Sequence, residues 1–136
     1  MKKIFLIAIG LLLLGSSAFF IKAESANVPK FVSYQTVLTQ NKPGVLYFYS
    51  RTCGHCVTMA PIINKLQKEY SNTYNFAKID VDNPRNARIC NQNNIWAVPA
   101  IYLYNPKKQT LGPIPPQYFT ERLLREILTR YPNKIK

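Results

Sequence analysis

Hydrophobic residues occur along this chain in two patterns, as short continuous runs and as longer stretches with helical spacing. The run VLYFYS at 45–50 is β-branched, aromatic or leucine up to its final serine, which predicts a strand buried on both faces. Similar runs predict strands at 74–80 and 100–104, and a short edge strand at 109–114. The pattern therefore predicts a sheet of four strands.

Helical spacing appears between these runs. Apolar residues recur every three or four positions at 31–40 and at 53–70, where Pro61 is expected to kink or break the helix. The pair Asn83-Pro84 opens a short predicted helix that ends near residue 92. The last helix is the most regular, and its apolar face carries Phe119, Leu123, Leu124, Ile127, Leu128 and Tyr131.

The order of the predicted elements indicates the fold class. Two charge pairs at i,i+4 spacing, Glu121 with Arg125 and Glu126 with Arg130, support the last helix. The order is then helix, strand, helix, strand, helix, strand, strand, helix. Strands that alternate with helices imply an α/β fold, here a central mixed sheet with a parallel core and an antiparallel hairpin. A chain of 136 residues has room for one such domain.

The N-terminal end has the layout of a targeting segment. In residues 1–23 two lysines precede an uncharged apolar stretch at 4–21, which is typical of a signal peptide and also long enough for an N-terminal membrane anchor. We then expect a linker at 24–30 and the folded domain at 31–136. The expected location is exported, in a periplasm or another extracytoplasmic space, either soluble after cleavage or anchored by 4–21.

The expected domain is strongly basic. Without residues 1–23 the chain has 15 basic and 6 acidic residues, a net charge of +9. The basic residues are spread along the chain, which favours a solvated surface over a binding patch. Attraction to anionic lipid or to acidic client proteins is the alternative, and it leaves membrane association open. Nucleic acid is not an expected partner, because the sequence contains no recognisable binding module.

The candidate reactive residues lie in the motif Cys53-Gly54-His55-Cys56, where a predicted strand meets a predicted helix. At a helix N-terminus the sulfur of Cys53 faces unpaired backbone N–H groups and the positive end of the helix dipole, which favour thiolate over thiol. His55, when protonated, and Arg51 add positive charge nearby. Cys53 is therefore the predicted nucleophile.

Cys56 is one helical turn further on, close enough to resolve a mixed disulfide formed on Cys53. A structural role for this pair is disfavoured, because closing so small a loop removes little chain entropy. A zinc site made by these cysteines with His55 and Cys90 is also disfavoured, since adjacent His55 and Cys56 would have to bend onto one ion and no second CxxC exists. We expect no metal and no organic cofactor. The redox-active disulfide Cys53–Cys56 would be the group that exchanges electrons.

From about residue 31 to residue 131 the chain resembles the thioredoxin superfamily. The features that carry the resemblance are the motif Cys53-Gly54-His55-Cys56, identical to that of protein disulfide isomerase domains, the kinking proline Pro61, a lysine beneath the active site at Lys78, and Val98-Pro99. The resemblance implies a thioredoxin fold in which Val98-Pro99 is a cis-proline loop beside the dithiol. It also implies that Val98, Pro99 and Ala100 orient the client chain.

Two residues depart from the family pattern. Thr52 stands where many members have a tryptophan, and Tyr47 stands where thioredoxins hold a buried acid that takes a proton from the second cysteine. Water or Lys78 would then have to take that proton. A histidine inside the motif stabilises the reduced thiolate form, which makes the disulfide form a stronger oxidant.

These features predict an exported thiol:disulfide oxidoreductase that acts as an oxidase or isomerase on unfolded or folding exported proteins and is recharged by a membrane or soluble redox partner. One alternative is a periplasmic reductase fed by a membrane electron donor, of the cytochrome maturation type. Another is a redox-idle thioredoxin-like binding module of an exported complex. Cys90 is expected to be a buried small hydrophobe or a free reactive thiol. Trp96 is expected in the core or at its rim.

Overall fold

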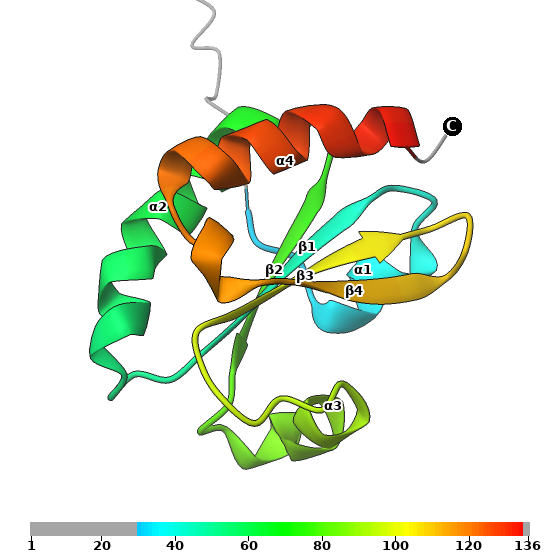
Figure 1. Ribbon diagram of the computed structural model, residues 1–136. Coiled ribbons are helices and arrows are strands. Elements are labelled where there is room, and N and C mark those ends of the chain that lie inside the picture. The colour runs from blue at the N-terminus through cyan, green and yellow to red at the C-terminus, as the bar shows by residue number, and fades with distance from the viewer. Residues whose placement is uncertain (1–29, 135–136) are drawn as a thin grey trace, which may run out of the picture.

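The computed structural model describes residues 30–134, and the central feature is a four-stranded sheet with helices on both faces (Figure 1). The expected signal peptide or anchor at 1–23 and most of the linker at 24–30 lie outside the described residues. The elements along the chain are α1 (Tyr34–Thr39), β1 (Gly44–Tyr49), α2 (Gly54–Tyr70), β2 (Asn75–Asp80), η1 (Pro84–Asn86), α3 (Ala87–Gln92), β3 (Ala100–Asn105), β4 (Thr110–Ile114), η2 (Pro116–Tyr118) and α4 (Glu121–Lys134).

The strands lie in the order β2-β1-β3-β4. Strands β1 and β2 are parallel, whereas β3 is antiparallel to both β1 and β4. The expected mixed sheet, with a parallel core and an antiparallel hairpin, is therefore confirmed. In this register Tyr47 of β1 lies between Lys78 of β2 and Ile101 of β3. The Tyr47 hydroxyl reaches the carbonyl oxygen of Cys56 in the first turn of α2.

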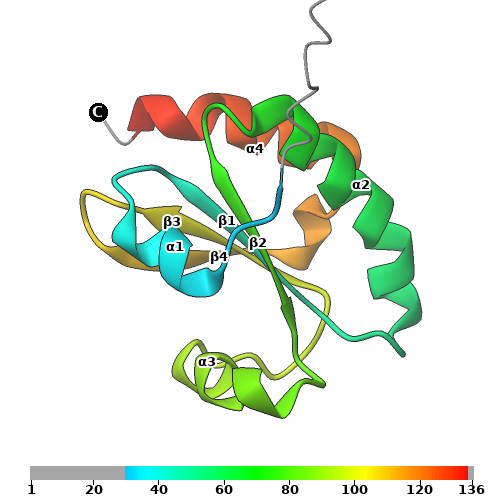
Figure 2. The same cartoon turned by 180° about the vertical axis from the view of Figure 1, so that it is seen from behind.

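Side chains of β1 alternate between two hydrophobic clusters, as the pleat of a strand requires. Val45 and Tyr47 pack with residues of α2 and α4, whereas Leu46 and Phe48 pack with Val37 of α1 and with residues of α3. Figure 1 shows α2 and α4 on one face of the sheet and α3 on the other, and Figure 2 shows α1 on that second face. Burial on both sides explains why the sequence of β1 is almost wholly apolar.

The end of the fold opposite the motif is fastened by polar contacts. Tyr74 is buried at the start of β2, and its hydroxyl donates to the carbonyl oxygen of Leu128 in α4 at 2.7 Å. The expected pairs Glu121–Arg125 and Glu126–Arg130 are present at 2.8 Å each. Lys65 of α2 adds a bridge to Glu121 at 2.7 Å. The Lys65 bridge joins α4 to α2, and the Tyr74 bond joins α4 to β2, so both lie away from the N-terminus of α2, which carries the site.

Some expected elements differ in detail. The first helix begins only at Tyr34, because the Ser33 side chain accepts a hydrogen bond from the Thr36 N–H and caps the helix there. The helix expected from Asn83 to residue 92 is divided into η1 and α3. Helix α2 continues through Pro61 as one element. No helix within residues 30–134 has the length and apolar character needed to cross a membrane.

The edges of the two outer strands, β2 and β4, differ in what lies along them. The Val32 N–H donates to the carbonyl oxygen of Phe76 at 2.8 Å, so the segment before α1 lies against β2. Strand β4 is the other outer strand, and it contains Pro113 opposite Tyr102. A proline contributes no N–H to a strand edge.

Candidate functional site

The dithiol motif sits at the N-terminus of α2, as expected. Cys53 is the N-cap residue of this helix, and its sulfur accepts a hydrogen bond from the Cys56 N–H at 3.2 Å. Both cysteines are free thiols, and the Cys56 thiol points at the Cys53 sulfur with 2.6 Å between the two Sγ atoms. Gly54 begins the helix with open space around the position of a Cβ atom. The two sulfurs can form a disulfide, whose bond length is about 2.05 Å, with little movement.

The two sulfurs differ in burial. Cys53 is half-buried, whereas Cys56 is only 2% exposed. Burial raises the pKa of the Cys56 thiol, and its hydrogen bond to Cys53 raises it further. The Cys53 sulfur is thus the one that an external disulfide can reach, and the Cys56 sulfur is buried behind it.

The loop before β3 lies directly beside Cys53. The Val98–Pro99 peptide bond is cis, as the resemblance implied. The Cys53 thiol donates to the carbonyl oxygen of Val98 at 3.6 Å. Ala100, the first residue of β3, lies opposite Phe48 of β1. Of the three residues expected to orient a client, Val98 contacts the accessible sulfur through its carbonyl oxygen, and Pro99 and Ala100 follow it along the chain into β3.

A groove with a volume of about 440 Å³ opens between α2 and this loop. We call it the client groove; it is lined by His55, Thr58, Met59, Ile62, Ala97, Val98, Pro99, Pro116 and Phe119. His55 is exposed and contributes the polar end of an otherwise largely apolar lining. Pro116 and Phe119 come from η2 and the turn after it, far from the motif in sequence, and no local pattern could have assigned them to the site.

Two large apolar side chains are exposed, one directly after the motif and one just before the cis-proline loop. Val57 follows Cys56 and is 65% exposed, and Trp96 is 86% exposed two residues before Val98. Trp96 is therefore neither in the core nor at its rim, which corrects the expectation for this residue. Its loop is held by a hydrogen bond from the Ile95 N–H to the Cys90 carbonyl at 2.9 Å, and Trp96 belongs to neither apolar cluster.

Tyr47 occupies the position behind the dithiol where the family pattern has an acid. Its side chain is 1% exposed, and its hydroxyl donates to the backbone carbonyl oxygen of Cys56 at 3.0 Å. Its ring stacks on Tyr49 with 5.6 Å between centroids. Burial raises the pKa of Tyr47 above its ordinary range. Tyr47 is thus a fixed hydrogen-bond donor beneath the first turn of α2.

A second hollow, of about 320 Å³, reaches Cys56 on another side. We call it the Lys78 cavity; it is lined by Tyr49, Ser50, Arg51, Cys56, Val57, Ala60 and Lys78. The Lys78 ammonium group lies over the rings of Phe31 and Tyr49, 5.2 and 5.3 Å from their centroids. Lys78 is therefore a half-buried cation beneath the active site, as the resemblance implied.

A polar network borders the motif on the side of Thr52. The Ser50 hydroxyl donates to Asp82 at 2.6 Å and contacts the Thr52 hydroxyl at 2.9 Å. Arg51 bridges to Asp80 at 2.8 Å, which offsets the positive charge expected to act on Cys53. Ser50, Asp80 and Asp82 were not predicted as site residues, although their positions at the ends of β1 and β2 were a usable signal.

The third cysteine is not part of this site. Cys90 is buried in the cluster between the sheet and α1 and α3, where burial raises the pKa of its thiol. The buried alternative for Cys90 is therefore the one that the structure supports. Among residues 30–134, no group of three or more histidine, cysteine or acidic side chains is placed to hold a metal ion.

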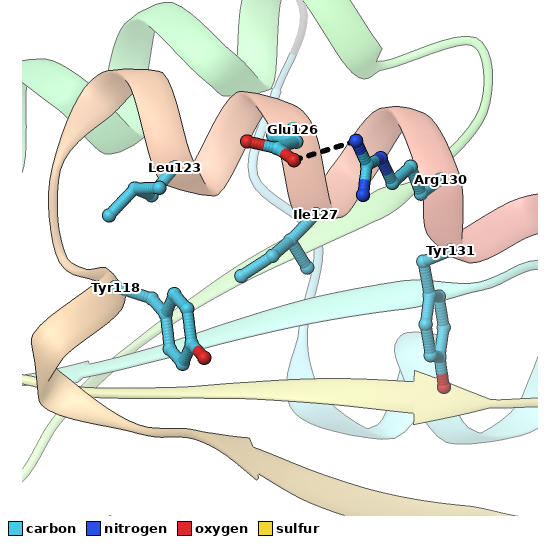
Figure 3. Close-up of a pocket in the computed structure, with 6 residues that line it drawn as sticks. All are labelled: Tyr118, Leu123, Glu126, Ile127, Arg130 and Tyr131. Carbon is cyan, nitrogen blue, oxygen red and sulfur yellow. Dashed lines mark ion pairs between the residues drawn. The ribbon is translucent and has the colours of Figure 1, made fainter.

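A further hollow of about 320 Å³ runs along α4 and shares no residue with the two at the dithiol. Figure 3 shows Leu123 and Ile127 on α4, Tyr118 on the segment that precedes this helix, and the Glu126–Arg130 pair on the helix above them. No cysteine lines it.

A dithiol at a helix N-terminus, beside a cis-proline loop and on a mixed four-stranded sheet, defines a redox protein of the thioredoxin fold. A thioredoxin family model matches residues 26–121, and the chain belongs to the thioredoxin family. Homologues in this family are thiol-disulfide oxidoreductases.

Individual relatives agree with this assignment. Thioredoxin of Mycobacterium bovis is 32% identical over 101 residues, which cover 71% of this chain and 81% of that protein. The chloroplastic thioredoxin-like protein HCF164 of Oryza sativa subsp. japonica is 26% identical over 95 residues, 67% of this chain. This chain spans only 36% of the length of that protein.

Solved structures confirm the fold. Thioredoxin from Trypanosoma brucei brucei has a TM-score of 0.61 and 21% identity, and the match covers 77% of this chain and 96% of that chain. The Trx4 domain of ERdj5 has a TM-score of 0.63 and 19% identity, covering 79% of this chain and 97% of that domain. The predicted α/β thioredoxin fold is therefore confirmed.

Proposed function

We propose that this protein is an exported thiol:disulfide oxidoreductase that exchanges disulfides with client proteins and works as an oxidase or isomerase. The observation that carries the proposal is the position of Cys53: it caps α2, accepts the Cys56 N–H, and lies 3.6 Å from the carbonyl oxygen of Val98. The sulfur that reacts and the backbone that can align a client are on one surface.

The proposed reaction runs in two exchanges. A client thiolate attacks Cys53 of the Cys53–Cys56 disulfide; a client–Cys53 disulfide forms, and Cys56 leaves as a thiolate that takes up a proton. A second client thiolate then attacks the client sulfur of this bond, which leaves the client with a disulfide and Cys53 as a thiolate. The protein ends reduced, so a redox partner must accept two electrons to recharge it.

His55 supports the oxidising direction. It is the motif residue that distinguishes Cys-Gly-His-Cys from other CxxC sequences, and it is exposed beside Cys53 on the wall of the client groove. A protonated imidazole there stabilises the reduced form. Reduction potentials are about −180 mV for protein disulfide isomerase and about −270 mV for thioredoxin, and we expect this protein nearer the first value.

The client groove supports the choice of client. Its lining is largely apolar; Val57 is exposed directly after the motif, and Trp96 is exposed two residues before Val98. Unfolded chains expose apolar side chains around their cysteines, whereas folded proteins hide them. We therefore propose unfolded or folding exported proteins as clients. Export itself is proposed from the lysines and apolar stretch of residues 1–21.

A reductase is the second candidate, because the relative from Mycobacterium bovis is named a thioredoxin and is 32% identical. The deciding experiment is the equilibrium reduction potential of the Cys53–Cys56 pair in glutathione buffers, measured with Cys90→Ala in the background. A value near that of protein disulfide isomerase supports the oxidase or isomerase, and a value near that of thioredoxin supports a reductase fed by a membrane donor.

Two activity assays test whether this protein is an enzyme. Oxidative refolding of a reduced client and reduction of insulin are measured for the parent protein and for Cys53→Ser. We expect Cys53→Ser to lose both activities. Equal behaviour of the two proteins would instead support a redox-idle binding module.

A further inference from the structure

The buried thiol of Cys56 must lose its proton before it can attack a disulfide on Cys53. The nearest candidate acceptor is Tyr47, which stands where the family pattern has a buried acid. Its hydroxyl is already committed as a donor to the Cys56 carbonyl at 3.0 Å. Burial also raises its pKa, so the neutral phenol persists at the pH of the reaction. Tyr47 therefore holds the first turn of α2 in place and does not accept the proton.

The carboxylates of residues 30–134 are engaged elsewhere. Asp80 bridges to Arg51, and Asp82 accepts hydrogen bonds from the Ser50 hydroxyl and the Arg51 N–H. The remaining three, Glu69, Glu121 and Glu126, form ion pairs with basic residues of α2 and α4. None of the five lines the Lys78 cavity. The described part of the chain thus offers Cys56 no internal carboxylate.

The Lys78 cavity provides the alternative route. It opens to solvent, and Cys56 and Lys78 are both on its wall. The Lys78 ammonium group has a defined position, because it lies over the rings of Phe31 and Tyr49. His55 lines the client groove and not this cavity. The ionisable groups around Cys56 are Cys53 on α2, Tyr47 and Tyr49 on β1, Arg51 before α2 and Lys78 on β2.

We propose that Cys56 passes its proton to solvent bases through the Lys78 cavity, where the Lys78 ammonium group stabilises the thiolate that remains. This inference rests on the proposed thiol-disulfide exchange. A water molecule or small buffer base takes the proton from Cys56. The Cys56 thiolate then attacks the Cys53 sulfur of a Cys53–client disulfide, the Cys53–Cys56 disulfide forms, and the client leaves as a thiolate. Lys78 is a positioning residue in this step, and solvent is the base.

The step can be isolated with an aromatic disulfide, 5,5′-dithiobis(2-nitrobenzoate), and the full chain carrying Cys90→Ala. Attack by Cys53 releases one coloured thiolate, and attack by Cys56 on the resulting mixed disulfide releases the second. The second release therefore reports Cys56 alone. We expect its rate to rise about tenfold per pH unit between about pH 5 and pH 8 without an inflexion, because only the thiolate fraction of Cys56 changes. Imidazole at fixed pH should leave the rate unchanged, because the proton is lost in an equilibrium that precedes the attack.

Substitutions separate the two residues. Lys78→Met is expected to slow the second release about tenfold, the effect of losing one stabilising charge, with the first release unchanged. Lys107→Met, an exposed lysine in the hairpin turn, is the matched control and should leave both releases unchanged. Tyr47→Glu supplies the missing acceptor and should raise the rate at about pH 6 at least fivefold and introduce an inflexion. Tyr47→Phe should keep the straight pH profile.

The outcomes are distinct. An inflexion below about pH 7 in the parent protein would reveal an internal acceptor and overturn the inference. An unchanged second release in Lys78→Met would overturn it as well. Absence of the first release would refute the proposed function itself, because Cys53 would then not be a nucleophile. Circular dichroism of each variant identifies a loss of folding, and Tyr47→Glu and Lys78→Met test the inference independently if one of them fails to fold.

Discussion

The Cys53 sulfur lies 3.6 Å from the carbonyl oxygen of Val98, on the cis-proline loop. Any chain that bonds to Cys53 must therefore run beside the backbone of this loop. Cys56 lies on the inner side of Cys53 and is almost wholly buried. The site thus has an outer sulfur that another molecule can reach and an inner, buried sulfur directly behind it.

Removing the inner sulfur should trap clients on the outer one. We expect Cys56→Ser to accumulate mixed disulfides between Cys53 and client proteins, because the thiolate that would displace the client is missing. Non-reducing gels and mass spectrometry of the bonded cysteine measure the trapped species. Cys53→Ser is the matched control and should trap few or none. Equal trapping by both variants would show that the two sulfurs do not have these separate roles.

The exposed indole of Trp96 should contribute to client binding. Trp96→Ala is expected to weaken binding of an unfolded client peptide by about 1–2 kcal/mol, roughly five- to thirtyfold, because part of the indole surface is buried on the client. The measurement is fluorescence anisotropy of a labelled peptide with Cys53→Ser protein, which prevents covalent capture.

Two further variants make this result specific. Trp96→Phe should retain most of the affinity, since an aromatic surface remains. Tyr118→Ala removes another exposed aromatic side chain, on the α4 hollow, and should have no effect. A loss of affinity in Tyr118→Ala as large as that in Trp96→Ala would mean that binding is non-specific.

The stability of the reduced protein should fall in mild alkali. Burial raises the pKa of Cys56, so the folded protein keeps a proton that the unfolded chain loses above the ordinary thiol pKa of about 8.5. The unfolded state then binds fewer protons, and the free energy of unfolding decreases as the pH rises through this range. Below it the contribution is fully present.

Urea unfolding between about pH 7.5 and pH 9.5 measures this slope below the tyrosine range. The oxidised protein is the control, because a Cys53–Cys56 disulfide has no thiol proton to lose, whereas Cys90 titrates in both forms. We expect a steeper decrease for the reduced protein. Parallel slopes in the two forms would contradict the raised pKa of Cys56.

The hydroxyl of Tyr74 should anchor α4 to the sheet. Tyr74→Phe leaves the Leu128 carbonyl without its buried donor and is expected to lower the free energy of unfolding by about 1–3 kcal/mol. Chemical denaturation measures the change. Tyr70→Phe is the control, because the hydroxyl of Tyr70 bonds near the surface to Thr129 and should matter less. An equal loss in both variants would mean that burial of the bond is not what makes it strong.

The sequence alone predicted the parts of this fold that depend on local pattern. The apolar run of β1, the amphipathic face of α4 and the position of Cys53 at the start of α2 are each visible in a few consecutive residues. The resemblance added the cis-proline loop, which the structure places beside Cys53.

The sequence alone could not predict which residues distant along the chain pack together. Phe119 lines the same groove as His55, and Asp82 accepts a hydrogen bond from Ser50, although each pair is separated by more than 30 positions. The exposure of Trp96 was also not predictable, because its aromatic character favours burial and only the course of the loop decides otherwise. Tyr49 was within reach, since it lies two residues after Tyr47 on the same face of β1.

Pro113 makes the outer strand β4 less able to pair with another strand. Extended segments of other chains can add themselves to an open strand edge, which is how aggregates begin. Strand β4 is short, lacks one N–H at Pro113, and begins beside a turn that carries Lys107 and Lys108. Each of these features discourages edge-to-edge pairing. Strand β4 is thus a poor template for pairing with the extended backbone of any chain that bonds to Cys53.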